Sequence, residues 1–232
     1  MPHALVLVNF SVAPASESEF NQFYHHEFLP KLEEASPEIA NIRRFEEFAL
    51  GGSARWYHKQ FLTIYQLTDG TTAEQADAMF GNPEVQDVVL RFREWTEKVL
   101  SNFSRTVFVP GWCHARTNGQ PHFTGPMFFW QLEMKPELDA GFQQWYEQDY
   151  LPLQVAEIPT WVGCRRYTSV GTPQSRHLTV FETSDETTLS RSLQDLRAVH
   201  RIEQNLEWQK RVEPAVTWQD ASTFRPIFRW PD

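Results

Sequence analysis

The sequence contains one segment twice. Residues 20–45 align without a gap with residues 142–167, at a constant offset of 122. Eight of these 26 positions are identical. The identical pairs are Phe20/Phe142, Gln22/Gln144, Tyr24/Tyr146, Leu29/Leu151, Pro30/Pro152, Pro37/Pro159, Arg43/Arg165 and Arg44/Arg166. An internal repeat of this length predicts two similar modules of about 110 residues each rather than one large fold.

Each repeat has the same predicted order of elements. An apolar run of strand length (4–10 and 127–132) is followed by a helical stretch (16–29 and 138–151) that Pro30 and Pro152 interrupt. A second strand carries the Arg-Arg pair, and a third follows at 61–67 and 177–183. Each repeat then has a second helical region, ending around Trp95 and Trp208, and a final strand near 105–109 and 216–224.

This β-α-β-β-α-β order predicts an α+β protein made of two tandem ferredoxin-like repeats. We place repeat 1 at residues 1–112, a linker at 113–125 and repeat 2 at 126–232. The first strands are apolar on both alternating faces, so we expect both faces of each sheet to be covered. The two antiparallel sheets would then pack into an α+β barrel within one chain. A further homodimer is left open.

Charge and hydropathy exclude several classes of function. The net charge of −9 has scattered signs, so no basic surface for nucleic acid is expected. No apolar run approaches the roughly 18 residues of a membrane span. The first residues have no basic leader and no cleavage site, which predicts a cytoplasmic protein. Cys113 and Cys164 occupy non-equivalent places in the repeats, which argues against a disulfide framework.

The aromatic content is high, with 9 Trp, 18 Phe and 6 Tyr among 232 residues. Such rings can line a pocket for a flat organic ligand, or they can fill a core or a subunit interface. For any one ring the second interpretation is slightly favoured; if the rings line a pocket, the partner is a hydrophobic or aromatic small molecule.

A helical wheel places a carboxylate on the aromatic face of the first helix in each repeat. At about 100° per residue, Glu27 falls on the face of Phe20, Phe23 and Tyr24, and Asp149 falls on the equivalent face of repeat 2. A carboxylate buried there needs a cation, a donor or a cavity.

The Arg pairs offer that cation. Neighbouring strand residues point to opposite faces, so one arginine of each pair faces a covered side. Either it forms a bridge to Glu27 or Asp149 that holds helix to sheet, or it binds an acidic substrate group while the carboxylate moves a proton. Polar residues of the central strands are further candidates for a cavity: Asn9, Thr63, Gln131 and Thr179.

The histidines indicate a functional site less clearly than the carboxylates and arginines do. His177 begins the third strand of repeat 2, and His58 lies three residues before the third strand of repeat 1, so either could shuttle protons. His25 and His26 are neighbours on a helix and face about 100° apart, which makes them poor joint metal ligands. No Gly-rich phosphate loop, His-x-x-x-His pair or nucleophile elbow is present. A nucleotide cofactor and zinc therefore lose support, and our first hypothesis has no metal and no organic cofactor.

The motif FYHHEFLP, its echo WYEQDYLP and the later Arg-Arg-aromatic strand resemble the dimeric α+β barrel superfamily, in particular EthD-like proteins. The resemblance implies a pocket between helices and sheet for small, mostly hydrophobic molecules, often without a cofactor. Relatives include polyketide cyclases, isomerases and monooxygenases. Relatives often have His before Leu-Pro, where this chain has Phe28 and Tyr150. Any proton transfer is therefore reassigned to Tyr150, Asp149, Glu27 or a strand histidine.

We expect a cofactor-independent enzyme that cyclises, dehydrates or isomerises an aromatic or polyketide-like substrate, with repeat 2 favoured as the site. The alternatives are a non-catalytic binding or stress-associated protein, and a haem protein or monooxygenase with His177 or His200 as the iron ligand. The expected catalytic residues are Asp149, Tyr150, Tyr146, Glu27 and His177. The expected substrate-binding residues are Arg165, Arg166, Trp145, Gln131, Tyr24, Arg44 and His58.

Overall fold

The computed structural model describes residues 3–50, 59–114, 123–172 and 174–230. They divide into two compact units, one made of residues 3–109 with 224–230 and the other of residues 110–223. The division follows the internal repeat, except that the last part of the chain belongs to the first unit.

In the first unit, β1 (Leu5–Val12), β3 (Gln60–Leu67) and β2 (Ile39–Glu47) form an antiparallel sheet in that order. Thr63 lies opposite both Val8 and Arg44 in this register. β4 (Leu100–Cys113) pairs with β1, and the end of β8 (Val216–Trp230) pairs with β2. β1 is buried on both alternating faces, as the sequence predicts.

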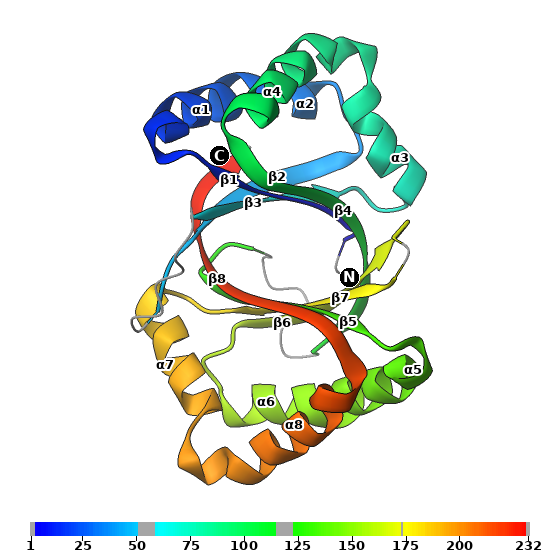
Figure 1. The fold of residues 1–232 in the computed structure, drawn as a ribbon, viewed down its shortest axis with the longest axis vertical. Coiled ribbons are helices and arrows are strands. Elements are labelled where there is room, and N and C mark those ends of the chain that lie inside the picture. Colours follow the sequence, from blue (N-terminus) through cyan, green and yellow to red (C-terminus); the bar gives the residue numbers. More distant parts are fainter. Residues whose placement is uncertain (1–2, 51–58, 115–122, 173, 231–232) are drawn as a thin grey trace. The chain divides into compact units, whose positions relative to one another are not determined.

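Helices cover one face of this sheet (Figure 1). The first helical stretch consists of a 3-10 turn (Pro14–Ser16), α1 (Glu17–Phe23), a π-helical turn (Tyr24–Phe28) and α2 (Leu29–Glu34). The second consists of α3 (Ala73–Ala78), two 3-10 turns (Met79–Gly81 and Pro83–Val85) and α4 (Gln86–Lys98). The Thr72 hydroxyl caps α3 by accepting from the Gln75 amide.

The second unit repeats this plan. Its sheet contains β5 (Met127–Met134), β7 (Arg176–Glu182) and β6 (Gly163–Val170), again antiparallel and in that order. Its helical segments are α5 (Pro136–Trp145), a π-helical turn (Tyr146–Tyr150), α6 (Leu151–Glu157), α7 (Glu186–Leu196), a 3-10 turn (Val199–Arg201) and α8 (Ile202–Ala215). The predicted order of elements is therefore confirmed in both repeats.

The hydrogen-bonded strand order is β4-β1-β3-β2-β8 in the first unit and β5-β7-β6 in the second. The α+β fold class predicted from the sequence is confirmed. Most of the predicted linker at 113–125 lies outside the described residues. No helix in the described ranges is both long and apolar enough to cross a membrane.

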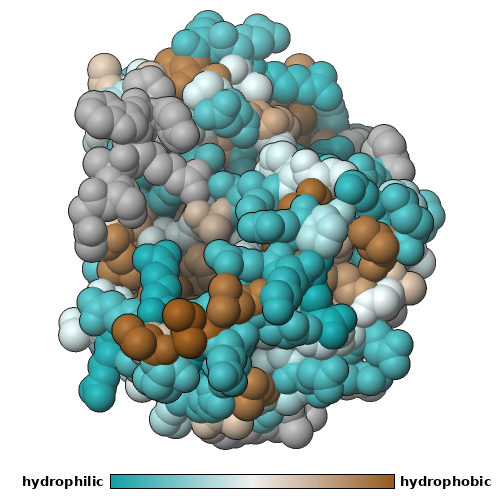
Figure 2. Space-filling view, turned by 60° about the horizontal axis from the view of Figure 1, so that its bottom comes forward, coloured by the Kyte–Doolittle hydropathy of each residue, from teal (hydrophilic) through white to brown (hydrophobic). Residues whose placement is uncertain are grey.

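On the face shown in Figure 2, hydrophilic residues predominate and hydrophobic residues form small separate groups. Val199, Ile202 and Leu206 are among the exposed apolar residues. The possibility of a homodimer stays a prediction.

The π-helical turn has a cause in the sequence. The Leu29 amide donates to the Tyr24 carbonyl, five residues back, and the Leu151 amide donates to the Tyr146 carbonyl in the same way. Proline lacks an amide proton, and its ring in an α-helix clashes with the carbonyl four residues back. A wider turn just before Pro30 and Pro152 relieves that clash. It also adds a residue to the turn, so the helical faces that follow are displaced.

Candidate functional site

The π-helical turn corrects the positions predicted for two carboxylates. Glu27 is exposed and forms an ion pair with Arg91 of α4, and both side chains are about half exposed. Asp149 is exposed as well. Neither carboxylate lies on the buried aromatic face, so that expectation is wrong in both repeats. A straight helical wheel misses the added residue of the π-helical turn.

The residues that face the buried arginines are His25 and Glu147, which precede the predicted carboxylates by two positions. Arg44 Nη1 donates to Asn21 Oδ1 at 2.7 Å and lies 2.6 Å from His25 Nε2. Arg166 Nη1 donates to Glu147 Oε1 at 2.9 Å. The predicted bridges from Glu27 and Asp149 to these arginines are therefore replaced by contacts from residues two positions earlier.

Arg165 points to the opposite face of its sheet from Arg166. Its Nη1 donates to Glu182 Oε2 at 2.6 Å, and both side chains are buried. A Cβ at position 163 would crowd Arg165 Nη1 and Glu182 Oε2, so Gly163 leaves room for this pair. Burial raises the pKa of Glu182, although Arg165 opposes the shift. The pair ties β6 to β7, which is a structural role.

Gln131 also faces away from the helices. It is buried on β5 next to Trp130, whose ring contacts Tyr146 on the helix-covered face, 5.6 Å between centroids. Because strand neighbours alternate, Gln131 points to the other face of the sheet. The structure therefore brings neither Gln131 nor Arg165 to the expected site around Tyr146.

Repeat 2 places other predicted residues together. The Arg166 guanidinium lies 4.7 Å from the centre of the Tyr146 ring, and Tyr150 stacks on Tyr146 at 5.3 Å. Trp145 packs against the edge of this group, 5.2 Å from Tyr150. Burial raises the pKa of Tyr150 to about 12, with Arg201 opposing the shift. Each of these tyrosines is therefore a neutral donor near pH 7.

His177 is buried on β7. Its Nε2 lies 3.0 Å from Asp139 Oδ1, and burial together with the Arg166 charge lowers the pKa of His177, while Asp139 opposes this. His200, the other suggested iron ligand, is exposed. His58 lies outside the described residues.

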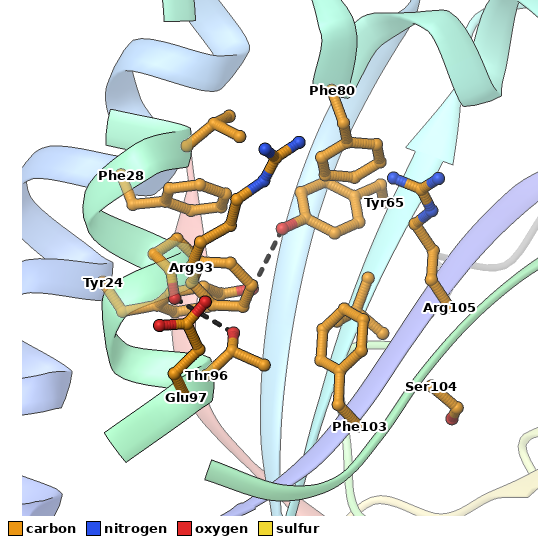
Figure 3. Close-up of a pocket in the computed structure, with 13 residues that line it drawn as sticks. Tyr24, Phe28, Tyr65, Phe80, Arg93, Thr96, Glu97, Phe103, Ser104 and Arg105 are labelled. Atoms are coloured by element: carbon orange, nitrogen blue, oxygen red, sulfur yellow. Dashed lines mark hydrogen bonds between the residues drawn. The ribbon is translucent and has the colours of Figure 1, made fainter. Parts of the chain in front are cut away.

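A cavity of about 510 Å³ opens in repeat 1, between α4 and the sheet (Figure 3). Its volume is in the range typical of sites for small organic ligands. Its lining is mostly aromatic and aliphatic, with a few polar and charged groups. The lining residues are Val8, Tyr24, Phe28, Tyr65, Phe80, Val89, Phe92, Arg93, Thr96, Glu97, Phe103, Ser104 and Arg105.

Two tyrosine hydroxyls meet at the wall of this cavity, as Figure 3 shows. The hydroxyls of Tyr24 and Tyr65 are 3.0 Å apart, and Tyr24 also donates to Thr63 Oγ1 at 3.1 Å. Burial raises the pKa of both phenols, that of Tyr65 well above its usual value, while the Arg44 charge opposes the shift at Tyr24. Both hydroxyls stay protonated near pH 7, and each can turn its single proton from its present acceptor to a ligand oxygen.

Stacked rings form one wall of the cavity. Phe28 stacks on Tyr24 with centroids 5.1 Å apart, and Phe92 of α4 stacks on Phe28 at 4.9 Å. Phe80 meets the Tyr65 ring edge-on at 5.6 Å. Phe103 is partly exposed and lies 5.9 Å from Phe92. These faces suit a flat, apolar ligand.

Charged groups also line the cavity. Arg105 lies over the Phe80 ring at 4.7 Å and forms an ion pair with Asp77 at 2.8 Å. Arg93 and Glu97 are both exposed and lie about one turn apart on α4. A ligand in the cavity therefore reaches a carboxylate, two guanidinium groups and two phenols.

Repeat 2 lacks one part of this arrangement. At the offset of 116 that relates Thr63 to Thr179, Tyr65 corresponds to Phe181. The paired hydroxyls therefore occur in repeat 1 and not at the equivalent place in repeat 2. The site favoured from the sequence was in repeat 2, because it has a phenol at Tyr150.

Sequence reasoning found Tyr24 and Arg44 but missed Tyr65, His25, Glu147 and the α4 residues of the cavity. Comparing the third strands of the repeats gives one usable signal, since a tyrosine in FLTIYQL replaces a phenylalanine in HLTVFET. For His25 and Glu147 the signal is the Pro that follows the first helix in both repeats. Nothing in the sequence pattern distinguishes the cavity residues of α4 from other residues of an amphipathic helix.

The described residues contain no group of three or more His, Cys, Asp or Glu side chains that could hold a metal ion. The cavity lining contains no histidine or cysteine to ligate haem iron. Its two phenols have raised pKa values and hydrogen-bond each other, which does not suit a phenolate ligand. Haem therefore does not fit this cavity.

Comparison with known proteins shows the fold. No protein-family model and no curated protein matches the sequence. Solved structures do match over nearly the whole chain. An anthrone oxidase-like protein has a TM-score of 0.64 at 10% identity, covering 99% of this chain and 93% of its own.

Two monooxygenase candidates are also similar. The one from Fusobacterium nucleatum has a TM-score of 0.60 at 9% identity, covering 98% of this chain and 94% of its own. The one from Lactobacillus acidophilus has a TM-score of 0.55 at 12% identity, covering 98% and 95%. At such low identity the likeness establishes the fold alone, in agreement with the α+β order of elements in both repeats.

Proposed function

We propose that this protein is a small-molecule enzyme that binds a flat, largely apolar substrate, aromatic or polyketide-like, in the cavity of repeat 1. One observation carries the proposal: two buried, protonated tyrosine hydroxyls meet at the wall of a cavity of about 510 Å³ that is otherwise lined by aromatic rings. Paired donors in an apolar site suit a carbonyl or phenol oxygen, because such hydrogen bonds strengthen where water is excluded.

The chemistry we propose is proton transfer next to a carbonyl group. Tyr24 and Tyr65 donate hydrogen bonds to the carbonyl oxygen, and the Glu97 carboxylate takes a proton from the neighbouring carbon. The electron pair of the broken C–H bond moves onto the oxygen and forms an enolate, which the two hydroxyls stabilise. Return of the proton to another atom completes an isomerisation, and loss of a β-hydroxyl as water completes a dehydration.

The resemblance to EthD-like proteins supports a cyclase, dehydratase or isomerase form of this reaction. The names of the similar structures support a second form, in which dioxygen is the co-substrate. There the enolate of a CH₂ group next to an aromatic ketone reacts with O₂, the CH₂ becomes C=O, and one oxygen atom leaves as water. Oxygen consumption distinguishes the two forms. A binding protein without activity remains the alternative, and turnover separates it from both.

Binding of a panel of polycyclic phenols and ketones, followed by tryptophan fluorescence, tests the proposal. Tyr65→Phe removes one donor and keeps the ring, so we expect about a fivefold loss of affinity, since one hydrogen bond contributes about 1 kcal/mol. Tyr24→Phe removes the other donor, with a similar loss. Turnover by Glu97→Gln should fall by at least about 100-fold with little change in affinity.

Tyr146→Phe, the equivalent change to Tyr24→Phe in repeat 2, is the matched control and should leave binding unchanged. A ligand whose affinity falls with Tyr146→Phe and not with Tyr65→Phe would contradict the placement in repeat 1. Failure of every phenol and ketone to bind would contradict the proposed function as a whole.

A further inference from the structure

Arg44 is a buried cation without a carboxylate partner among the described residues. Its side chain is fully buried, and its polar contacts are Asn21 Oδ1 and His25 Nε2. The guanidinium lies over four aromatic rings, 4.7 Å from those of Tyr24 and Phe61 and 5.5 Å from those of Phe10 and Phe20. Its Nε and Nη2 have no hydrogen-bond partner.

In repeat 2 the equivalent arginine has a different environment. Arg166 has a carboxylate at 2.9 Å, that of Glu147, and the residue equivalent to Glu147 in repeat 1 is His25. Burial and the neighbouring Arg44 charge lower the pKa of His25 to about 3. His25 is therefore neutral near pH 7, and its Nε2 accepts the hydrogen bond from Arg44. The positive charge is balanced in repeat 2 and left unbalanced in repeat 1.

The other charged groups near Arg44 do not remove the imbalance. Glu17 and Glu46 act on Arg44 from a distance, and both carboxylates bind Lys59, at 2.9 Å and 2.6 Å. Glu46 also binds Arg225 at 2.6 Å. The remaining titratable neighbours are the protonated phenols of Tyr24 and Tyr65. These groups together carry one net positive charge, that of Arg44.

Burying an unbalanced cation is costly, and aromatic faces offset only part of that cost. The Tyr24 ring that covers Arg44 carries the hydroxyl at the cavity wall, so the positive charge acts on the cavity through that phenol.

We infer that the cavity binds its ligand as an oxyanion, a phenolate or enolate, whose negative charge is stabilised by the buried guanidinium of Arg44 acting through Tyr24. The inference rests on the proposed function and narrows it to weakly acidic substrates: phenols and enolisable ketones in which the ionised oxygen meets Tyr24 and Tyr65. Arg44 does not line the cavity, so it is a positioning residue and not a catalytic one.

The test uses a hydroxyanthraquinone, whose neutral and ionised forms differ in colour, and its methyl ether, which cannot ionise. Wild-type protein should lower the ionisation pKa of the bound phenol by on the order of one unit. His25→Glu gives Arg44 a carboxylate, as in repeat 2, and should remove most of that shift. The methyl ether should bind the wild type and this variant with the same affinity.

Arg44→Met should act like His25→Glu on the pKa of the bound phenol, and Arg166→Met in repeat 2 is the matched control that leaves it unchanged. Should Arg44→Met fail to fold, His25→Glu decides alone, because repeat 2 already accommodates a glutamate at this position. An unshifted pKa in the wild type, or an equal shift in His25→Glu, overturns the inference and leaves the proposed function standing. If neither the phenol nor its ether binds, the proposed function fails, and the inference with it.

Discussion

His25 connects the electrostatics of repeat 1 to its stability. Its ring stacks on Phe228 with centroids 4.2 Å apart and an angle of 7°, and its Nε2 faces the buried Arg44. Burial and the charge of Arg44 favour the neutral imidazole, and the pKa of about 3 lies well below the usual 6.5. The unfolded chain therefore binds a proton at His25 at a higher pH than the folded protein does.

This difference predicts a pH effect on stability. The contribution of His25 is fully present above pH 6.5 and is lost as the pH falls from 6.5 toward 3, because only the unfolded state gains the proton in that window. Between pH 7 and pH 5, wild-type protein should lose about 1 kcal/mol more free energy of unfolding than His25→Gln does, allowing for partial exposure of the ring. Urea denaturation at the two pH values measures this.

His26→Gln is the control for that measurement. His26 is exposed, so this variant should follow the wild type. If His25→Gln lost as much stability as the wild type between pH 7 and pH 5, the lowered pKa would be wrong.

At the level of single residues, the site could be predicted only in part from the sequence. Tyr24 and Arg44 follow from the repeat and from strand alternation, both of which are local patterns. Tyr65 of β3 and Phe92 of α4 line the same cavity although they lie far apart in the sequence. No local pattern encodes that proximity.

The π-helical turns decide which side chains of the first helices face inward.

Most of the fold was predictable because hydrophobic periodicity and Pro positions mark the helices and strands. The final strands were predicted too short, near 105–109 and 216–224, whereas β4 covers Leu100–Cys113 and β8 covers Val216–Trp230. Long strands with exposed residues, as in β4, show little of the alternation from which a strand is read.

Because the π-helical turns leave Glu27 and Asp149 exposed, we expect both acids to be dispensable for stability and for ligand binding. Glu27→Gln breaks an exposed ion pair with Arg91, which should change the free energy of unfolding by no more than about 0.5 kcal/mol. Asp149→Asn should be as mild, because Asp149 is exposed. Neither change should alter ligand affinity, as fluorescence titration would show. A tenfold loss of affinity or of turnover in either variant would restore the role predicted from the helical wheel.

At the scale of the whole molecule, β8 belongs to both compact units. Its end pairs with β2, where Phe228 lies opposite Arg44, and Arg225 binds Glu46 at 2.6 Å. Phe224, 2% exposed, lies opposite Glu47. The first unit therefore depends on the end of the last strand of the second repeat.

Truncation of the chain after Thr223 tests this dependence. Loss of Phe224 alone should cost about 3–5 kcal/mol, as for other buried phenylalanines, and loss of the β2 pairing adds to it. Hydrogen exchange should show amide protection falling in β2 while β6 and β7 keep theirs. Arg229→Ala, at an exposed position of β8, is the control and should keep protection in β2. Unchanged protection of β2 in the truncated chain would contradict the dependence.

The position of β8 also bears on how the chain folds during synthesis. Ribosomes add roughly 5–20 residues per second, so the strand that completes the first sheet emerges roughly 6–23 s after Val109. Throughout that interval the nascent first repeat presents the unpaired edge of β2 to other chains, and such an edge invites mispairing. Chaperone binding to nascent chains should therefore be concentrated in this interval and end once β8 has docked.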